Sequence, residues 1–95
     1  MSYWVYILAS GRNGTLYIGV TRDLRVRVWQ HKTGVVDGFT RRYRVDQLVY
    51  FEGFGDITLA IQRDKQLKKW NRRWKIRIIE DMNAEWADLY DKIVD

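Results

Sequence analysis

The chain has 95 residues and a mass of 11.5 kDa, so we expect one domain spanning residues 1–95. It contains no proline and no cysteine, and 46% of its residues are hydrophobic; this is typical of a globular protein and excludes disulfide scaffolds and thiolate metal sites. No apolar run approaches the roughly 20 residues of a membrane helix, and residues 1–4 show no secretory signal. We therefore expect a cytoplasmic protein without a membrane partner.

The charge is unevenly distributed along the chain. Residues 1–79 carry 16 basic and 6 acidic side chains, a net charge of +10, whereas residues 80–95 carry one lysine and 6 acids, a net charge of −5. Of the 16 basic residues, 11 are arginines, whose planar guanidinium suits bidentate contacts with phosphate. The pattern favours nucleic acid as the partner. The alternative is a basic surface with the acidic segment folded against it.

The first 20 residues predict a β-hairpin. Residues 3–9 and 15–20 are rich in β-branched and aromatic side chains, and the turn cluster between them contains Asn13 and Gly14, which tolerate positive φ. Gly19 inside the second strand indicates either a bulge or a close approach to the backbone.

The next segment predicts a helix followed by a loop. Thr21 is the expected N-cap of a helix over residues 22–32, and Gly34 is expected to end it. Residues 35–46, which contain Gly38 and a basic string, are predicted to form a loop.

The rest of the chain predicts one strand and two helices, followed by a weakly amphipathic segment over residues 84–94. Gly53 and Gly55 are expected to end the strand, Asp56 to cap the first helix, and Asn71 to separate the two helices. The predicted ranges are 47–52 for the strand and 57–70 and 72–82 for the helices. The fold class is therefore α+β, a three-stranded antiparallel sheet flanked by helices in the order β-β-α-β-α-α.

The first predicted helix carries two candidate functional side chains. Arg27 and His31 lie one turn apart and flank Leu24 and Val28, the apolar pair that is expected to face the sheet. A guanidinium and an imidazole would thus lie at the margin of the buried face. Solvated charges on an exposed helix are the alternative.

Asp64 is predicted to lie in the middle of an apolar helix stripe. The stripe comprises Ile57, Ala60, Ile61, Asp64, Leu67 and Lys68. A carboxylate there costs free energy unless a cation or hydrogen bonds satisfy it. Either Asp64 forms an ordinary i,i+4 pair with Lys68, or it binds a hard cation such as Mg²⁺, which takes one or two carboxylates together with substrate phosphates.

Two tyrosines complete the candidate set. Tyr6 and Tyr17 lie in the two hairpin strands, and their hydroxyls share one face of the sheet if the strand register permits. The alternative for each is a buried tyrosine whose hydroxyl is satisfied within the core.

The order of these residues resembles the GIY-YIG nuclease superfamily, in particular its small single-domain bacterial branch, the UPF0213-like proteins. The likeness begins with Trp4-Val5-Tyr6-Ile7 and Tyr17-Ile18-Gly19, and an arginine and a histidine follow the second tyrosine by ten and fourteen residues. It covers nearly the whole chain, through Gly34, Phe39-Thr40, Leu48-Val49-Tyr50, residues 64–70, Trp74-Lys75-Ile76 and residues 83–86.

The resemblance implies a metal-dependent endonuclease that hydrolyses phosphodiester bonds in DNA. One of the family's two tyrosines, which match Tyr6 and Tyr17, helps to activate the attacking water. The arginine that matches Arg27 binds the scissile phosphate, and His31 is implied to act as general base or to position the water. The glutamate that holds the family's single metal ion corresponds to Asp64. The implied cofactor is therefore one Mg²⁺ or Mn²⁺ ion, with no small-molecule cofactor.

The first motif and the metal-binding acid depart from the family pattern. The first motif has Trp4 and Val5 where the family has glycine and isoleucine, but it keeps the tyrosine. Asp64 is one methylene shorter than glutamate, which brings its oxygens roughly 1.5 Å nearer the helix. A misplacement of about 1 Å can lower a rate on the order of 10²-fold. Some relatives also carry a late asparagine at the site; Asn71 and Asn83 are the candidates, and both also suit caps or turns.

Basic side chains of the loop and the helix junction are the expected contacts with DNA. These are Arg41, Arg42, Arg44, Lys68, Lys69, Arg72 and Arg73. Trp70 and Trp74, one turn apart if the helix continues, are candidates for stacking on bases or for core packing. Because relatives of this size lack an extra DNA-recognition domain, the resemblance implies low sequence specificity, with structure-selective cleavage in DNA repair or processing.

Two other functions stay open at this point. The basic body and the replacement of glutamate by Asp64 are compatible with a nucleic-acid-binding module that does not cleave. The acidic segment over residues 80–95 is compatible with a protein–protein adaptor.

Overall fold

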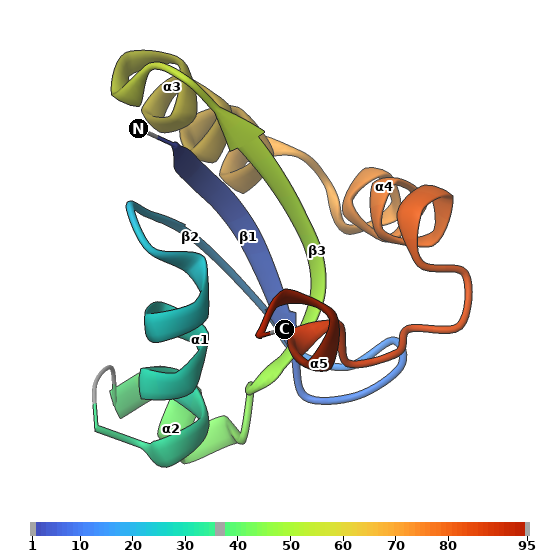
Figure 1. Cartoon of the computed structure of the whole chain (residues 1–95). Coiled ribbons are helices and arrows are strands. Elements are labelled where there is room, and N and C mark those ends of the chain that lie inside the picture. Colours follow the sequence, from blue (N-terminus) through green and yellow to red (C-terminus); the bar gives the residue numbers. More distant parts are fainter. Residues whose placement is uncertain (1, 36–37, 95) are drawn as a thin grey trace.

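The computed structural model describes residues 2–35 and 38–94, which form a three-stranded sheet and five helices (Figure 1). The elements are β1 (Tyr3–Ala9), β2 (Leu16–Thr21), α1 (Leu24–Thr33), α2 (Gly38–Tyr43), β3 (Gln47–Phe54), α3 (Ile57–Lys69), α4 (Arg72–Met82) and α5 (Tyr90–Ile93). The predicted α+β class is confirmed. No helix in the described part is both long enough and apolar enough to cross a membrane. The predictions for residues 1, 36, 37 and 95 lie outside the described residues.

The strands form one antiparallel sheet in the order β2-β1-β3. β1 occupies the centre because its side chains are apolar or aromatic on both faces, and residues 5–9 are all buried. The hairpin between β1 and β2 turns at Asn13, which has a φ of 58°, as its residue type predicts.

Gly19 in β2 is required by the packing of Tyr6. The two residues are opposite each other in the antiparallel ladder. A Cβ atom at position 19 would lie 2.5 Å from the Tyr6 hydroxyl oxygen and 2.6 Å from its Cζ atom. Of the two predicted explanations, the close approach is therefore correct. The irregularity of the sheet lies instead between β1 and β3, at Ile7 and Leu8.

Alternation along β1 divides the core into two clusters, one on each face of the sheet. Figure 1 shows α1 on one side of the sheet and α3 and α4 on the other. The face covered by α1, here called the α1 face, buries Tyr6, Leu8, Leu24, Val28, Val45, Leu48 and Leu89. The opposite face, here called the α3 face, buries residues that include Val5, Ile7, Ile18, Ala60, Leu67 and Ile79.

Side-chain caps fix the start of each long helix. Asp23 caps α1 by accepting a hydrogen bond from the backbone N–H of Val26, so the predicted N-cap at Thr21 is wrong. Thr21 instead accepts a hydrogen bond from the N–H of Asp23, and so orients the capping residue. Asp56 caps α3, as predicted, and Asn71 caps α4.

Two predicted boundaries are wrong. β3 continues beyond Gly53, because the Trp4 ring lies over that position, where a Cβ atom would be 2.9 Å from the ring. The predicted loop over residues 35–46 contains the helix α2. That helix is short, but Thr40 is buried within it and its carbonyl accepts a hydrogen bond from the N–H of Val45.

The acidic C-terminal segment packs against the outer side of β3. Asp88 accepts hydrogen bonds from the backbone N–H groups of Leu48 and Tyr90, and it forms an ion pair with Lys32 of α1. The N–H of Leu89 donates to the carbonyl of Leu48. At least one acid of this segment is therefore used within the fold.

Candidate active site

Tyr6 and Tyr17 lie on the same face of the hairpin, as predicted. Tyr17 is opposite Leu8 in the ladder, so it points to the α1 face together with Tyr6. The centroids of the two rings are 6.3 Å apart. Their exposure differs, because Tyr6 is 1% exposed and Tyr17 is half-buried. Tyr17 is therefore the tyrosine nearer to solvent.

His31 of α1 joins the two tyrosines. Only 2% of it is exposed, so it lies within the buried face of the helix and not at its margin. Its Nε2 atom is hydrogen-bonded to the Tyr6 hydroxyl at 3.0 Å, and its Nδ1 atom to the Thr40 hydroxyl at 3.0 Å. The Tyr17 ring centroid is 5.1 Å from that of His31. Partners on both ring nitrogens fix the orientation of the imidazole.

Arg27, one turn before His31, brings a positive charge to the tyrosines. Partial burial lowers the pKa of its guanidinium, but the neighbouring Tyr6 and Tyr17 hydroxyls raise it by more, so the net pKa is above its ordinary value. The guanidinium therefore stays charged while it is half-buried beside two phenols.

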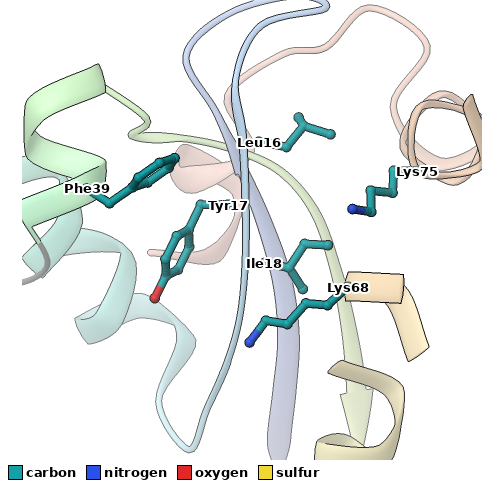
Figure 2. Close-up of a pocket in the computed structure, with 6 residues that line it drawn as sticks. All are labelled: Leu16, Tyr17, Ile18, Phe39, Lys68 and Lys75. Atoms are coloured by element: carbon teal, nitrogen blue, oxygen red, sulfur yellow. The ribbon is translucent and has the colours of Figure 1, made fainter. Parts of the chain in front are cut away.

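A surface pocket of about 320 Å³ lies at the edge of the sheet formed by β2. Its lining residues are Leu16, Tyr17, Ile18, Phe39, Lys68 and Lys75. Figure 2 shows Tyr17 and Ile18 on opposite sides of β2, with Phe39 near Tyr17 and Lys68 near Ile18. Because neighbouring strand residues point to opposite faces, the pocket is bordered by both the α1 face and the α3 face.

Asp64 lies on α3, on the other face of the sheet from the two tyrosines. It is 7% exposed and belongs to the buried side of the helix, with Ala60 and Leu67. The predicted apolar stripe is narrower than expected, because Ile57 and Ile61 are exposed. The fold thus brings Tyr6, Tyr17, Arg27 and His31 together on the α1 face, whereas Asp64 lies on the α3 face.

Lys68 connects Asp64 with the pocket. Its Nζ atom donates a hydrogen bond to Oδ2 of Asp64 at 3.0 Å, one helical turn away, so the i,i+4 pair considered from the sequence is present. Lys68 also lines the pocket together with Tyr17. Of the five side chains expected to share one pocket, Tyr6, Tyr17, Arg27 and His31 lie together, and of these Tyr17 lines the pocket. Asp64 lies on the opposite face, so its convergence with the other four stays a prediction.

The surroundings of Asp64 fit a hard divalent cation. Its Oδ1 atom is buried and is the one buried side-chain polar atom of the described residues without a hydrogen-bond partner. Carboxylate oxygen is the donor that Mg²⁺ and Mn²⁺ prefer. Residues 2–35 and 38–94 contain no group of three or more His, Cys, Asp or Glu side chains placed to hold a metal. An ion at Asp64 would therefore need water and substrate phosphate as further ligands.

The two candidate asparagines both have structural roles. Asn71 caps α4 by accepting a hydrogen bond from the N–H of Trp74. Asn83 is buried, and its amide group donates to the carbonyls of Val49 and Ala87 and accepts from the N–H of Ala87.

All seven predicted DNA contacts are exposed, but two of them are engaged in the fold. The exposed residues are Arg41, Arg42, Arg44, Lys68, Lys69, Arg72 and Arg73. Arg72 donates to the carbonyls of Asn13 and Gly14 at 2.6 Å each, and so fixes the hairpin turn against α4. Lys68 is held by Asp64. Contact with DNA stays a prediction for all seven.

Trp70 and Trp74 do not lie on one continuous helix, contrary to the condition under which they were expected to be one turn apart. α3 ends at Lys69, and Trp70 is its C-cap residue. The two rings nevertheless meet edge to face, with centroids 5.8 Å apart. Trp70 packs against the core of the α3 face, whereas Trp74 is half-exposed, so stacking on a base stays a prediction for Trp74.

Sequence reasoning missed the contribution of α2 to the site. Phe39 lines the pocket, and Thr40 is the hydrogen-bond partner of His31. Both residues belong to the segments that resemble the family, but no role was assigned to them. The available signal was the lone histidine, because a buried imidazole needs a partner for each ring nitrogen, and the hydroxyl of Thr40 supplies one.

The geometry agrees with comparisons to known proteins. Residues 2–77 match the family described as the GIY-YIG catalytic domain. The chain is 34% identical to a UPF0213 protein of Bacillus pumilus over 84 residues, 88% of this chain and 85% of that protein. It is 30% identical to a UPF0213 protein of Staphylococcus saprophyticus over 79 residues, 83% of this chain and 95% of that protein.

A solved structure is similar along its whole length. The solution NMR structure of a UPF0213 protein from Bacillus halodurans superimposes with a TM-score of 0.58 and 26% sequence identity, and the match covers 99% of this chain and 98% of that one. Together with the ordered motifs and the α+β fold, these matches show that the chain belongs to the GIY-YIG family, alongside the UPF0213 proteins.

Proposed function

We propose that this protein is a divalent-metal-dependent endonuclease that hydrolyses phosphodiester bonds in DNA with low sequence specificity. The observation that carries the proposal is the convergence of Tyr6, Tyr17, Arg27 and His31 beside a surface pocket. Hydrolysis of a phosphodiester needs an activated water, neutralisation of the phosphoryl charge and stabilisation of the leaving oxygen. The four side chains suit the first two requirements.

We assign Arg27 to the scissile phosphate. A guanidinium presents paired N–H donors that match phosphate oxygens. Because Arg27 is half-buried, its charge is screened less by water than that of an exposed arginine. Its raised pKa favours the charged form of the guanidinium.

We assign Tyr6 and His31 to proton transfer. When the Nδ1 proton of His31 is donated to the Thr40 hydroxyl, Nε2 is the acceptor for the Tyr6 hydroxyl proton. As the oxygen of water attacks phosphorus, the water proton passes to the Tyr6 oxygen and the Tyr6 proton passes to Nε2. The bond between phosphorus and the leaving sugar oxygen then breaks, that oxygen takes up a proton from solvent water, and His31 returns its proton to solvent through Tyr6. Thr40 is a positioning residue that holds the tautomer.

Tyr17 and Asp64 are assigned to the pocket side of the reaction. Tyr17 lines the pocket, and we assign it the orientation of phosphate and water in front of the buried Tyr6. Asp64 would hold the divalent ion, with phosphate and water as the remaining ligands. A bound divalent ion supplies charge stabilisation to the phosphate and to the leaving oxygen.

The basic surface supports DNA as the substrate. The exposed arginines and lysines, together with Lys68 and Lys75 of the pocket, suit contacts with the phosphate backbone, which carry no sequence information. We therefore propose cleavage that follows DNA structure, at nicks, branches or single strands, and a role in DNA repair or processing.

The proposal is tested by incubating the protein with nicked, branched and single-stranded DNA in Mg²⁺ or Mn²⁺. The variant Arg27→Ala is expected to lower the cleavage rate by about 10²-fold or more, because it removes the charge that faces the phosphate. Arg25→Ala is the matched control, since Arg25 is an exposed residue of the same helix. The same products at the same rate from wild type and Arg27→Ala would contradict the proposal.

A nucleic-acid-binding module without cleavage is the second candidate. The ion pair between Lys68 and the shorter acid Asp64 favours it, because this pair satisfies one carboxylate oxygen without a metal. Absence of Mg²⁺ and Mn²⁺ binding at millimolar concentration, with a steeply salt-dependent affinity for DNA, would favour this function over the first.

A further inference from the structure

We infer that Lys68 competes with a divalent ion for the carboxylate of Asp64. In the free protein its ammonium group is paired with that carboxylate, and it moves away when it binds a phosphate of DNA. Binding of a divalent ion at Asp64 and binding of DNA are then coupled through one lysine. This inference rests on the proposed function, because it concerns the carboxylate assigned to the metal.

The geometry places the two partners in different environments. Asp64 is almost fully buried on α3, with 10% of its side chain exposed, whereas 54% of the Lys68 side chain is exposed. The acid is thus fixed, and the lysine lies over it as a flexible chain that reaches the pocket. Displacement therefore requires movement of Lys68 only.

One of the two carboxylate oxygens of Asp64 has no partner among the described residues, and the other is held by Lys68. Oδ2 accepts the hydrogen bond of Lys68, and Oδ1 is buried without a partner. A divalent ion at either oxygen would lie within a few ångströms of the ammonium group. The repulsion between like charges at that distance is strong where water is partly excluded. We therefore expect weak metal binding as long as Lys68 stays in place.

A DNA phosphate can replace the carboxylate of Asp64 as the partner of the Lys68 ammonium group. Lysine binds phosphate as a mobile point charge, and Lys68 lines the pocket that Tyr17 borders. When Lys68 turns to a phosphate oxygen, Asp64 regains an unneutralised charge next to that phosphate. By thermodynamic reciprocity, DNA then raises metal affinity, and the metal raises DNA affinity by the same factor.

Neighbouring charges supply a control for this inference. Lys75 lines the same pocket, but it lies on α4, and the ion-pair partner of Asp64 is Lys68. Arg63, the residue before Asp64 in α3, is paired with Glu52 on β3. Removal of Lys75 therefore changes the charge of the pocket by the same amount without freeing Asp64.

The first experiment measures Mn²⁺ affinity by electron paramagnetic resonance, with no DNA present. Lys68→Met keeps an unbranched apolar stem, one atom shorter than lysine, and is expected to tighten Mn²⁺ binding by about twofold to fivefold, the range for loss of an exposed ion pair. Lys75→Met is expected to change it by less than about twofold. Asp64→Asn is expected to abolish the binding in the Lys68→Met background, and circular dichroism checks that each variant is folded.

The second experiment measures the coupling. Fluorescence anisotropy gives the affinity for a phosphorothioate oligonucleotide, which resists cleavage, with and without Mn²⁺. The gain in affinity on adding Mn²⁺ is expected to be about threefold or more for wild type and smaller in Lys68→Met, where direct contact between the ion and the phosphate is the one coupling left.

The outcomes separate this inference from the proposed function. If Lys68→Met binds Mn²⁺ no more tightly than Lys75→Met, or if the coupling is as large in Lys68→Met as in wild type, the inference is wrong. The proposed function does not depend on that result, because the effect of Arg27→Ala on cleavage tests it separately. If Mn²⁺ binding does not depend on Asp64 in any background, both the inference and the metal assignment in the proposed function are wrong.

Discussion

The two faces of the sheet differ in how far the hydrogen bonds of one buried polar side chain are satisfied, His31 on the α1 face and Asp64 on the α3 face. On the α1 face, the imidazole of His31 is bonded to Tyr6 and to Thr40, and these three residues are almost fully buried. On the α3 face, Asp64 is buried with one oxygen paired to an exposed lysine and the other without a partner. Both ring nitrogens of His31 thus have hydrogen-bond partners within the fold, whereas one carboxylate oxygen of Asp64 has none in the part of the chain that the structure describes.

This difference suits two different roles: the network of the α1 face holds its side chains in a fixed orientation, and the carboxylate of the α3 face can accept a cation. A polar network whose members satisfy one another holds its geometry before substrate arrives, which is how a group is oriented for proton transfer. A buried carboxylate with an open position gains most from an added cation. The edge strand β2 contributes side chains to both faces, and two of them, Tyr17 and Ile18, line the same pocket.

The largest expected effect comes from breaking the α1 face at Tyr6. Tyr6→Phe keeps the ring but removes the hydroxyl bonded to His31, and we expect the DNA cleavage rate to fall by about 10³-fold, within the range for loss of general base catalysis. Tyr3→Phe in the same strand serves as control and should leave the rate unchanged. A rate for Tyr6→Phe close to that of wild type would remove Tyr6 from the mechanism.

The α3 face is tested at Asp64. Asp64→Asn keeps the shape but removes the charge, and we expect cleavage to fall by about 10²-fold, because the divalent ion loses its protein ligand. Asp64→Glu restores the family residue and extends the carboxylate by roughly 1.5 Å, so we expect a higher rate than wild type. Quenched-flow or gel assays in Mg²⁺ and Mn²⁺ measure both. Equal rates for all three proteins would place the metal elsewhere.

A smaller effect is expected from a substitution at Gly19 of β2, against which the ring of Tyr6 packs. Gly19→Ala would put a Cβ atom 2.5 Å from the Tyr6 hydroxyl, and we expect it to lower the free energy of unfolding by about 1–3 kcal/mol, as overpacking does. Urea denaturation measures this. Gly11→Ala is the control, since a Cβ atom there meets nothing within 4 Å. Equal stability of the two variants would show that Tyr6 moves aside without cost.

The smallest effect concerns Tyr50 on the α3 face. Burial raises its pKa above the ordinary 10.0, and the hydrogen bond that it donates to Glu52 adds to the shift. The folded state thus holds this proton more tightly than the unfolded state. The resulting stability is present below about pH 10 and is lost as the pH rises through the folded pKa. Denaturation between pH 8 and 11 should show this loss in wild type and a weaker one in Tyr50→Phe, which itself costs about 1 kcal/mol near neutral pH.

Much of the fold could be predicted because its signals are local. The strand over residues 3–9 and the helix over residues 72–82 have the predicted bounds. The cap at Asp56 and the left-handed C-cap at Gly34 follow from the residue types alone.

The errors arise where tertiary contacts override local signals. Gly53 continues a strand because the ring of Trp4 needs the space, and α2 forms because Thr40 is buried on His31. Neither contact leaves a periodic pattern in the sequence. The same holds for the site: the identity of its residues came from their order, but which face of the sheet carries Asp64 depends on how α3 crosses the sheet.

The contacts of the C-terminal segment affect how two molecules can associate. An open strand edge is a template for pairing with a second chain, and it is a common route to aggregation. The backbone N–H and carbonyl of Leu48 at the start of β3 are already bonded to Asp88 and Leu89, so this end of the outer strand is closed to a partner. The other edge of the sheet is β2, and a chain added there would cover Leu16 to Ile18, which line the pocket. Strand addition at β2 would therefore block access of a ligand to the pocket.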